Sequence, residues 1–110
     1  MRMFEDREKA AEATFRQEQE LAFKITARRN RMLGAWAAAQ LGLAGEAATR
    51  YARTVVDAEL GGGDRAVIGK LRADLAAGGV PASDQQLMRK LMAFAELARA
   101  EFQAAARGAS

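Results

Sequence analysis

A chain of 110 residues, rich in alanine, with 6% aromatic residues and one proline, has room for one domain and favours helices over strands. It contains no cysteine and no histidine, which excludes disulfides, thiol nucleophiles and the usual zinc sites, and removes the commonest general base. The formal net charge of +3, with both signs interspersed, is too small to indicate a nucleic-acid-binding protein.

Residues 1 to 20 are strongly helix-prone but carry few large apolar side chains. At helical spacing, Phe4, Ala11 and Phe15 share one narrow stripe. Burying a phenylalanine stabilises by about 1.5 to 3 kcal/mol, whereas ordering each backbone residue costs about 1 to 2 kcal/mol, so two such anchors do not fix the whole segment. We therefore expect a partly disordered arm that becomes helical when a partner supplies a groove. The alternative is a plain, frayed extension of the first helix without a role.

Acid-before-base pairs at i, i+4 predict weak ion pairs along this arm, each worth about 0.2 to 0.5 kcal/mol. Such pairs support a helix without attaching it to anything else. They are Glu5 with Lys9, Glu12 with Arg16, and Glu20 with Lys24.

Residues 23 to 42 are the densest run of large apolar residues and hold the only tryptophan. A helix here is expected to end at Leu41, before Gly42. Read as a helix, Ile25, Met32 and Trp36 fall near one face, with Leu33 on its flank. This is the spacing of a helix that faces a core.

A second, basic stripe on the same helix consists of Lys24, Arg28 and Arg31. It is either a solvated face or a contact for a nucleotide phosphate or a nucleic-acid backbone. Gly34 sits opposite the arginines among other small residues, so a neighbouring helix can approach closely there.

Glycines divide the rest of the chain into three further helices. The first, Glu46 to Leu60, turns Val55 inward and leaves Tyr51 at the rim with its hydroxyl in water. Asp64 is expected to be the N-cap of the next, which turns Leu71 inward and ends before Gly78 and Gly79.

The last helix is expected to begin at Ser83, because Ser83 and Gln86 have the spacing of a capping box. It runs to Arg107. The residues predicted for the core are Ile25, Met32, Leu33, Trp36, Val55, Leu71, Leu91 and Phe102.

Four helices joined by short turns predict an all-α protein, a small four-helix bundle over residues 21–110 from which residues 1–20 project. No apolar run approaches the roughly 20 residues that cross a bilayer, and the N-terminus is charged rather than signal-like. We therefore expect a cytoplasmic protein without membrane insertion.

The sequence offers little that could carry catalysis. Gly61-Gly-Gly-Asp64 before a helix invites comparison with a phosphate loop, but it lacks the lysine of that motif and is better explained as a turn and cap. Neither Ser83 nor Ser110 has a histidine to activate it. We predict no catalytic residue, no metal site and no cofactor, and an enzyme is the least expected class.

Two blocks of the sequence resemble the F1-ATPase inhibitor zeta subunit family of alphaproteobacteria. The first is Phe4-Glu-Asp-Arg-Glu-Lys-Ala through Phe15. The second runs from Phe23-Lys through Ala27-Arg-Arg-Asn and Leu33-Gly to Trp36-Ala-Ala and Leu41-Gly. Weaker matches extend the likeness over nearly the whole chain.

The resemblance implies a regulatory inhibitor of ATP hydrolysis by the F1 part of ATP synthase. The N-terminal segment would enter a catalytic α/β interface near the central stalk and block rotation, on a protein that is monomeric when free and reaches the membrane only through the synthase. The partner-binding residues implied are Phe4, Glu5, Asp6, Arg7, Glu8, Lys9, Ala11 and Phe15.

Two positions depart from the family pattern. Ala11 stands where a bulkier apolar residue is expected, and Thr14 where lysine is common. A missing aromatic anchor weakens binding by around 2 kcal/mol if it is a hot spot. The alternative function is a small helical module that binds a nucleotide weakly, or less expectedly a nucleic acid, through Lys24, Arg28 and Arg31.

Overall fold

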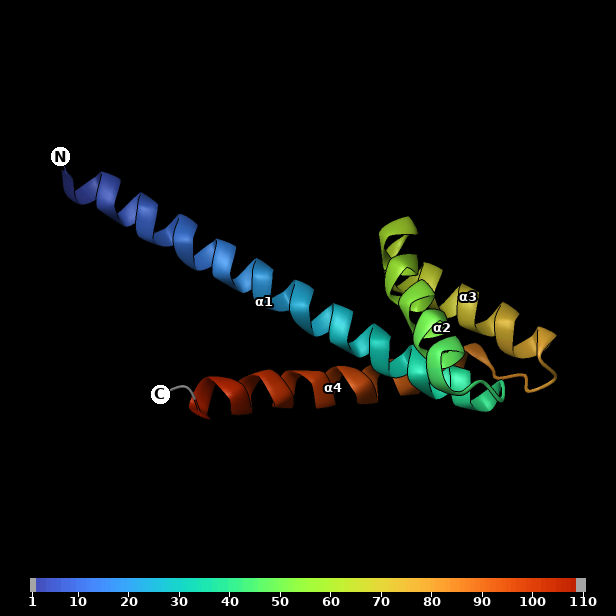
Figure 1. Cartoon of the computed structure of the whole chain (residues 1–110). Coiled ribbons are helices and arrows are strands. Elements are labelled where there is room, and N and C mark those ends of the chain that lie inside the picture. Colours follow the sequence, from blue (N-terminus) through green and yellow to red (C-terminus); the bar gives the residue numbers. More distant parts are fainter. Residues whose placement is uncertain (1, 109–110) are drawn as a thin grey trace.

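The structure, a computed structural model, describes residues 2–108 and contains four α-helices and no strand within them (Figure 1). The prediction of an all-α four-helix protein is confirmed. Ser110 lies outside the described residues. The elements are α1 (Arg2–Gln40), α2 (Gly45–Ala58), the short 3-10 helix η1 (Glu59–Gly61), α3 (Gly63–Ala77) and α4 (Asp84–Gly108).

Helix α1 organises the molecule. It packs against α2, α3 and α4, and α3 also packs against both α2 and α4. At about 1.5 Å per residue its 39 residues span almost 60 Å, which accounts for most of the 64 Å long axis of a molecule only 30 by 24 Å across. Helices α2 and α3 gather at its C-terminal half, α4 runs back below α1 at an angle to it, and the N-terminal half of α1 projects away from all three (Figure 1).

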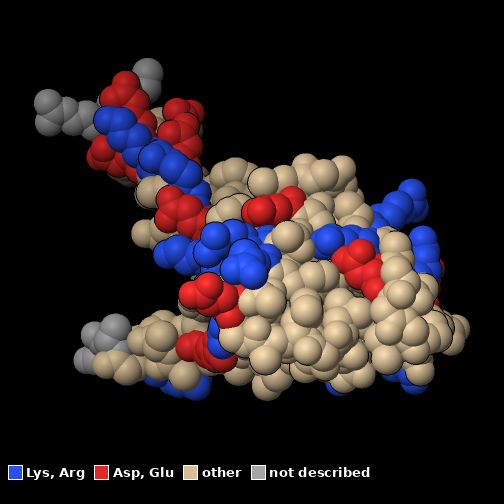
Figure 2. Space-filling model, turned by 45° about the vertical axis from the view of Figure 1, so that its right-hand side comes forward, with Lys and Arg blue, Asp and Glu red and all other residues tan. Residues whose placement is uncertain are grey.

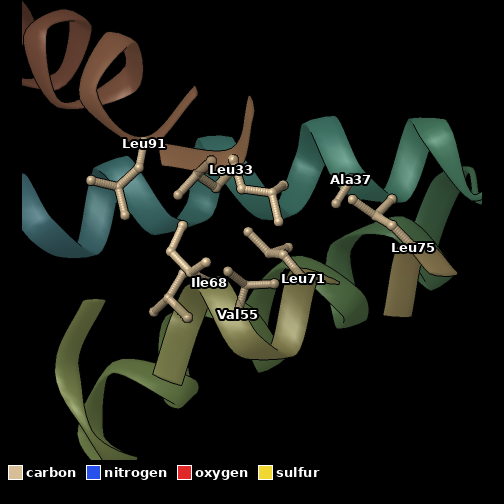
Figure 3. Packing of buried hydrophobic residues seen from close by; sticks show 9 residues of the cluster. Leu33, Ala37, Val55, Ile68, Leu71, Leu75 and Leu91 are labelled. Atoms are coloured by element: carbon tan, nitrogen blue, oxygen red, sulfur yellow. The ribbon is translucent and has the colours of Figure 1, made fainter. Parts of the chain in front are cut away.

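The core lies where α1, α2, α3 and the start of α4 meet (Figure 3). Its members are aliphatic, and most come from α1 and α3, whose apolar side chains recur every three or four residues. They are Leu33, Ala37, Val55, Val67, Ile68, Leu71, Leu75, Leu87 and Leu91.

Four residues of the expected core are buried, namely Leu33, Val55, Leu71 and Leu91. The others, Ile25, Met32, Trp36 and Phe102, are half-buried. The inward face of α1 is centred on Leu33 and Ala37 rather than on Trp36, because α2 and α3 pack on that side. Trp36 lies against the edge of the core, with the Lys90 ammonium 5.3 Å from its ring centroid.

The close approach expected at Gly34 is confirmed. A Cβ atom on this glycine would lie 2.5 Å from the Cα and 2.9 Å from the Cβ of Ala52. The crossing of α1 and α2 therefore depends on two small residues, because any larger side chain at Gly34 would push the helices apart.

Helix ends follow the glycines as the sequence indicated. Gly42 and Gly79 have positive φ angles of 76° and 77°, a conformation in which glycine carries no steric penalty. At the first of these ends, Leu43 N donates to Ala38 O at 2.8 Å, and at the second, Val80 N donates to Leu75 O at 2.9 Å. These bonds satisfy carbonyls that the last turn of a helix leaves free.

The capping box at the start of α4 is also confirmed. Gln86 N donates to Ser83 Oγ at 3.1 Å, and Ser83 N donates to Gln86 Oε1 at 2.9 Å.

The N-cap predicted at Asp64 is wrong. Gly62 is the N-cap residue of α3, and this helix start has no hydrogen bond from a capping side chain. Asp64 instead lies in the first helical turn, where its carboxylate pairs with α1.

Tyr51 is half-buried at the rim of the core, as expected, but its hydroxyl is not left to water. Its Oη donates to Asp74 Oδ2 at 2.8 Å, and Lys70 Nζ donates to the same oxygen at 2.9 Å. Partial burial and this bond to a carboxylate raise the pKa of Tyr51. Since Asp74 and Lys70 belong to α3, the hydroxyl attaches α2 to α3, a contact that short-range spacing does not reveal.

The Gly34 crossing leads to a stability prediction. Gly34→Ala should destabilise the protein by about 1 to 3 kcal/mol, because its Cβ has no room against Ala52. Gly69→Ala, within α3, is the matched control: its Cβ would meet nothing within 4 Å, so it should stabilise by about 0.5 to 1 kcal/mol through helix propensity. Urea unfolding of the two variants measures both changes, and equal effects would contradict the account of the crossing.

Candidate functional site

The N-terminal half of α1 is the candidate site, and residues 2–20 are called the arm below. The side chains of residues 3 to 24 are all exposed. The expectation of partial disorder is not met, because the arm continues α1 without a break. Starting a helix is costly, but extending one that is already held by packing adds a hydrogen bond per residue fixed. The arm needs no tertiary anchors of its own to be helical.

The arm carries an apolar stripe on one side. Phe4 is 70% exposed and Phe15 is 62% exposed, and Ala11 lies between them. At about 100° per residue, the two phenylalanines are only about 20° apart around the axis. Leu33, in the core, lies about 20° from Phe4 by the same measure. The stripe is thus the continuation of the core-facing side of α1, but nothing in the described chain packs on it.

Charged side chains of the arm, from residue 3 onward, form no ion pair within the described part of the chain. The three predicted i, i+4 pairs are therefore absent from the structure. Figure 2 shows acidic and basic side chains crowded on the projecting arm, whereas much of the visible bundle is uncharged. The carboxylates of the arm are free to meet basic groups of a partner.

The charged residues implied as partner contacts do not all share the side of the stripe. By helical spacing, Arg7 and Glu8 flank the stripe, whereas Glu5, Asp6 and Lys9 lie on other sides of the helix. A flat surface that covered the stripe would reach only the first two. A groove that encloses the helix would reach all five.

The basic stripe is not one continuous surface. Lys24 is exposed, but Arg28 is engaged by α4: its Nε donates to Glu101 Oε2 at 2.8 Å and its Nη2 to Oε1 at 3.3 Å. The hydrogen bond from Arg28 lowers the pKa of the Glu101 carboxyl. Arg31 lines a different surface pocket, together with Arg53 of α2, which sequence spacing alone did not connect with it.

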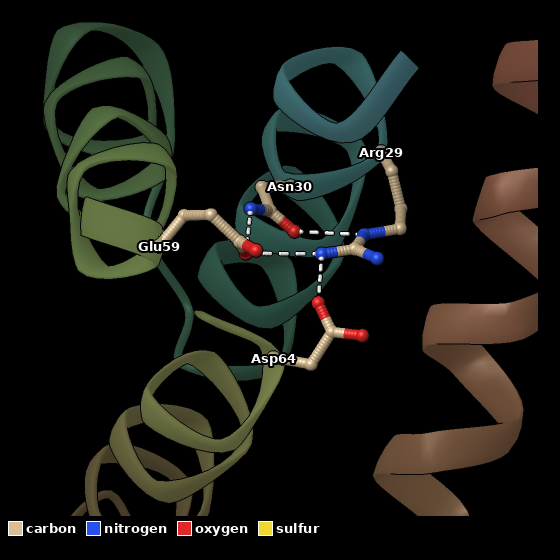
Figure 4. A network of polar contacts seen from close by, with 4 residues as sticks. All are labelled: Arg29, Asn30, Glu59 and Asp64. Carbon is tan, nitrogen blue, oxygen red and sulfur yellow. Dashed lines mark hydrogen bonds and ion pairs between the residues drawn. The ribbon is translucent and has the colours of Figure 1, made fainter. Parts of the chain in front are cut away.

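A network of four polar side chains holds α1 to the bundle at Arg29 and Asn30 (Figure 4). Arg29 Nη2 donates to Glu59 Oε2 at 3.0 Å and to Asp64 Oδ1 at 2.8 Å. Asn30 Nδ2 donates to the same Glu59 oxygen at 2.8 Å, and its own Oδ1 accepts from Arg29 Nε at 3.0 Å.

This network was not found from the sequence. The carboxylate partners of Arg29 follow 30 and 35 residues later, so no local pattern connects them. The only available signal was an arginine at a core-facing position, which needs a partner if it is buried. Arg29 and Asn30 are the first buried residues after the arm, and they join α1 to the α2–α3 corner.

Removing Arg29 should therefore weaken the fold. Arg29→Ala leaves Glu59 and Asp64 without their cation, and we expect a loss of about 2 kcal/mol. Arg99→Ala, which breaks an exposed pair with Glu96 on α4, is the control and should cost less than about 1 kcal/mol. Thermal and urea unfolding measure the difference, and equal losses would show that the network is no more than a surface ion pair.

The Arg28–Glu101 pair leads to a pH prediction. The pKa of Glu101 should lie below that of an ordinary glutamate and return to it in Arg28→Gln. Because the folded pKa is lowered, the pair stabilises above the ordinary glutamate pKa, and this contribution is lost as the pH falls through the lowered value. A carboxyl titration by NMR tests this, with Arg99→Gln as the control. A Glu101 pKa that ignores Arg28→Gln would contradict the pairing.

None of the helices in residues 2–108 combines the length and the apolar character needed to cross a membrane. No curated protein and no solved structure gives a match to the chain. A family model, that of ATPase inhibitor subunit zeta, matches residues 1–101, which include the arm, the network and most of α4. This match confirms the resemblance seen in the sequence: the chain belongs to the ATPase inhibitor subunit zeta family.

Proposed function

We propose that the protein inhibits ATP hydrolysis by the F1 part of ATP synthase and that the arm is its inhibitory element. Membership of the family supports an ATPase inhibitor. The observation that carries the finer proposal is the exposed apolar stripe of Phe4, Ala11 and Phe15, which lies on the core-facing side of α1 and has no partner. Such a face on a helix is typical of a segment that binds in a groove of another protein.

In this mechanism the arm inserts into a catalytic α/β interface near the central stalk. A catalytic interface must open and close during hydrolysis, so a helix held within it would block rotation. The free carboxylates on several sides of the arm favour an enclosing groove with basic groups. Residues 1–20 carry six acidic and four basic residues, a net charge of −2, whereas the remaining 8 acidic and 13 basic residues give +5.

The bundle would limit how far the arm enters. A single helix with its side chains is about 10 to 12 Å wide, whereas the molecule measures 30 by 24 Å across its shorter axes. A groove that admits one helix therefore excludes the bundle. Because α1 runs unbroken from the arm into the core, the two parts resist bending at their junction, which suits a wedge that must withstand rotation.

The stripe predicts a moderate affinity. Burial of each phenylalanine contributes about 1.5 to 3 kcal/mol, and Ala11 adds far less than a larger apolar residue would. Each 1.4 kcal/mol corresponds to about a tenfold change in the dissociation constant. Ala11 is exposed, so we infer that its small size reduces potency without preventing binding.

A nucleotide site remains a second candidate because Arg31 and Arg53 line one surface pocket with Thr49 and have no ion-pair partner in the described chain. This pair replaces the proposed set of Lys24, Arg28 and Arg31, in which Arg28 is already engaged by Glu101. If it holds a phosphate, titration with ATP at low salt should shift the amide signals of Arg31 and Arg53. Unchanged signals would remove this candidate.

The arm is tested by Phe4→Ala combined with Phe15→Ala. We expect the double variant to inhibit ATP hydrolysis at least about 100-fold less well, because both anchors of the stripe are lost. Met92→Ala, on α4, is the matched control, since Met92 is also apolar and is 62% exposed. The measurement is the rate of hydrolysis by F1 from the same organism, depleted of this subunit and titrated with each protein.

A shortened protein that begins at Glu20 provides a second test. It should not inhibit, while its bundle still unfolds cooperatively in urea. Inhibition by the shortened protein, or full potency of the double phenylalanine variant, would contradict the proposed mechanism.

A further inference from the structure

A second apolar surface lies at the junction of the arm and the bundle. Phe23 of α1 is 66% exposed and Leu60 of η1 is 83% exposed. Between them runs a groove lined also by Thr26, Ala27 and Val56. We call these five residues the junction patch. Such large apolar side chains gathered beside a groove are unusual on a surface that stays in water.

Two of the polar residues at this groove are already used by the protein. Asn30 and Glu59 both line it, but they bond to each other and to Arg29. Apart from Thr26 and Asp57, the groove therefore offers an apolar surface. Its volume is about 170 Å³, close to that of the roughly 150 Å³ apolar cavity that takes one benzene ring. It has room for one large apolar side chain.

The junction patch continues the surface of the arm. Phe15, Gln19 and Phe23 follow one another at i, i+4, so they form one row along the helix. Phe23 lies three residues past the end of the arm, about 5 Å further along the axis. By the measure used for the stripe, Phe23 lies about 80° around the axis from Phe15. A partner that encloses the arm to Glu20 therefore reaches Phe23 as well, and Leu60 stands beside it across the groove.

Asp57, which lies beside the junction patch, adds a negative charge to the groove. It lines the groove and is exposed, and its carboxylate forms no ion pair or hydrogen bond in the described chain. A group that fills the groove therefore gains from a neighbouring lysine or arginine, which would pair with this carboxylate.

We propose that the junction patch is a second contact with F1, and that it binds one large apolar side chain, flanked by a basic one, of the subunit surface that encloses the arm. This rests on the proposed function, because the arm is what brings that surface to the patch. The contact would fix the depth of insertion: the arm slides in until Phe23 and Leu60 meet their partner residue. A second copy of this chain is the competing occupant.

The test uses the full-length protein with Leu60→Ser. Leu60 is mostly exposed, so the change should not affect folding, which urea unfolding verifies. Leu97→Ser is the matched control, because Leu97 lies on α4 and is 55% exposed. Binding to F1 depleted of this subunit should weaken about tenfold or more for Leu60→Ser and remain unchanged for Leu97→Ser. Phe23→Ser should act like Leu60→Ser.

The outcomes separate this inference from the proposed function. If the unaltered protein binds F1 and both patch variants bind equally well, the junction patch is not a contact, and the arm mechanism still stands. If the unaltered protein does not bind F1, both proposals fail. Sedimentation at increasing concentration tests whether a second copy of this chain binds the patch. If Leu60→Ser abolishes self-association and leaves the affinity for F1 unchanged, the patch mediates contacts between copies, and the proposal is overturned.

Discussion

The ion pairs that the buried Arg29 makes with Glu59 and Asp64 fix where the bundle joins the projecting part of α1. They attach the middle of α1 to the connection between α2 and α3 at the end of the aliphatic core. A buried guanidinium is stable only if its charge and its donors are matched, and here two carboxylates and the Asn30 amide do so. The aliphatic core consequently has a definite end. Beyond it α1 still contacts α4 through Arg28 and Glu101, and from residue 24 back to residue 3 its side chains are exposed.

This arrangement explains how one helix supplies two different surfaces. From Arg29 to its end, α1 turns its apolar side toward other helices of the same chain. Up to residue 24 the side chains of α1 are exposed, and there the same side carries Phe4 and Phe15 and meets only solvent. The arm is therefore a piece of core-facing helix whose partner lies outside this chain. Since its backbone is already helical, binding requires less ordering than the folding of a disordered segment would.

Much of the fold was predictable because local rules decide it. Helix ends at Gly42 and Gly79, the capping box at Ser83 and the tight crossing at Gly34 all follow from short-range sequence and are present. The features that were not predicted depend on residues far apart in the sequence. The carboxylate partners of Arg29 lie 30 or more residues away. Disorder was expected of the arm because it has few apolar anchors of its own, but the packed part of α1, which the arm extends, is enough to keep it helical. The exposed stripe of the candidate site was visible, but the junction patch was not, since η1 reaches Phe23 only in the folded chain.

The most direct test of the central claim is amide hydrogen exchange of the full-length protein, free and bound to F1. Amides of the arm are hydrogen-bonded within a helix whose side chains are all exposed from residue 3 onward, so in the free protein they should exchange faster than amides of the bundle. In the complex they should become strongly protected, with protection extending no further into the bundle than the junction patch, while α3 and the start of α4 are unchanged. Protection confined to the bundle, with an arm that still exchanges as in the free protein, would show that F1 is bound by another surface and would contradict the account.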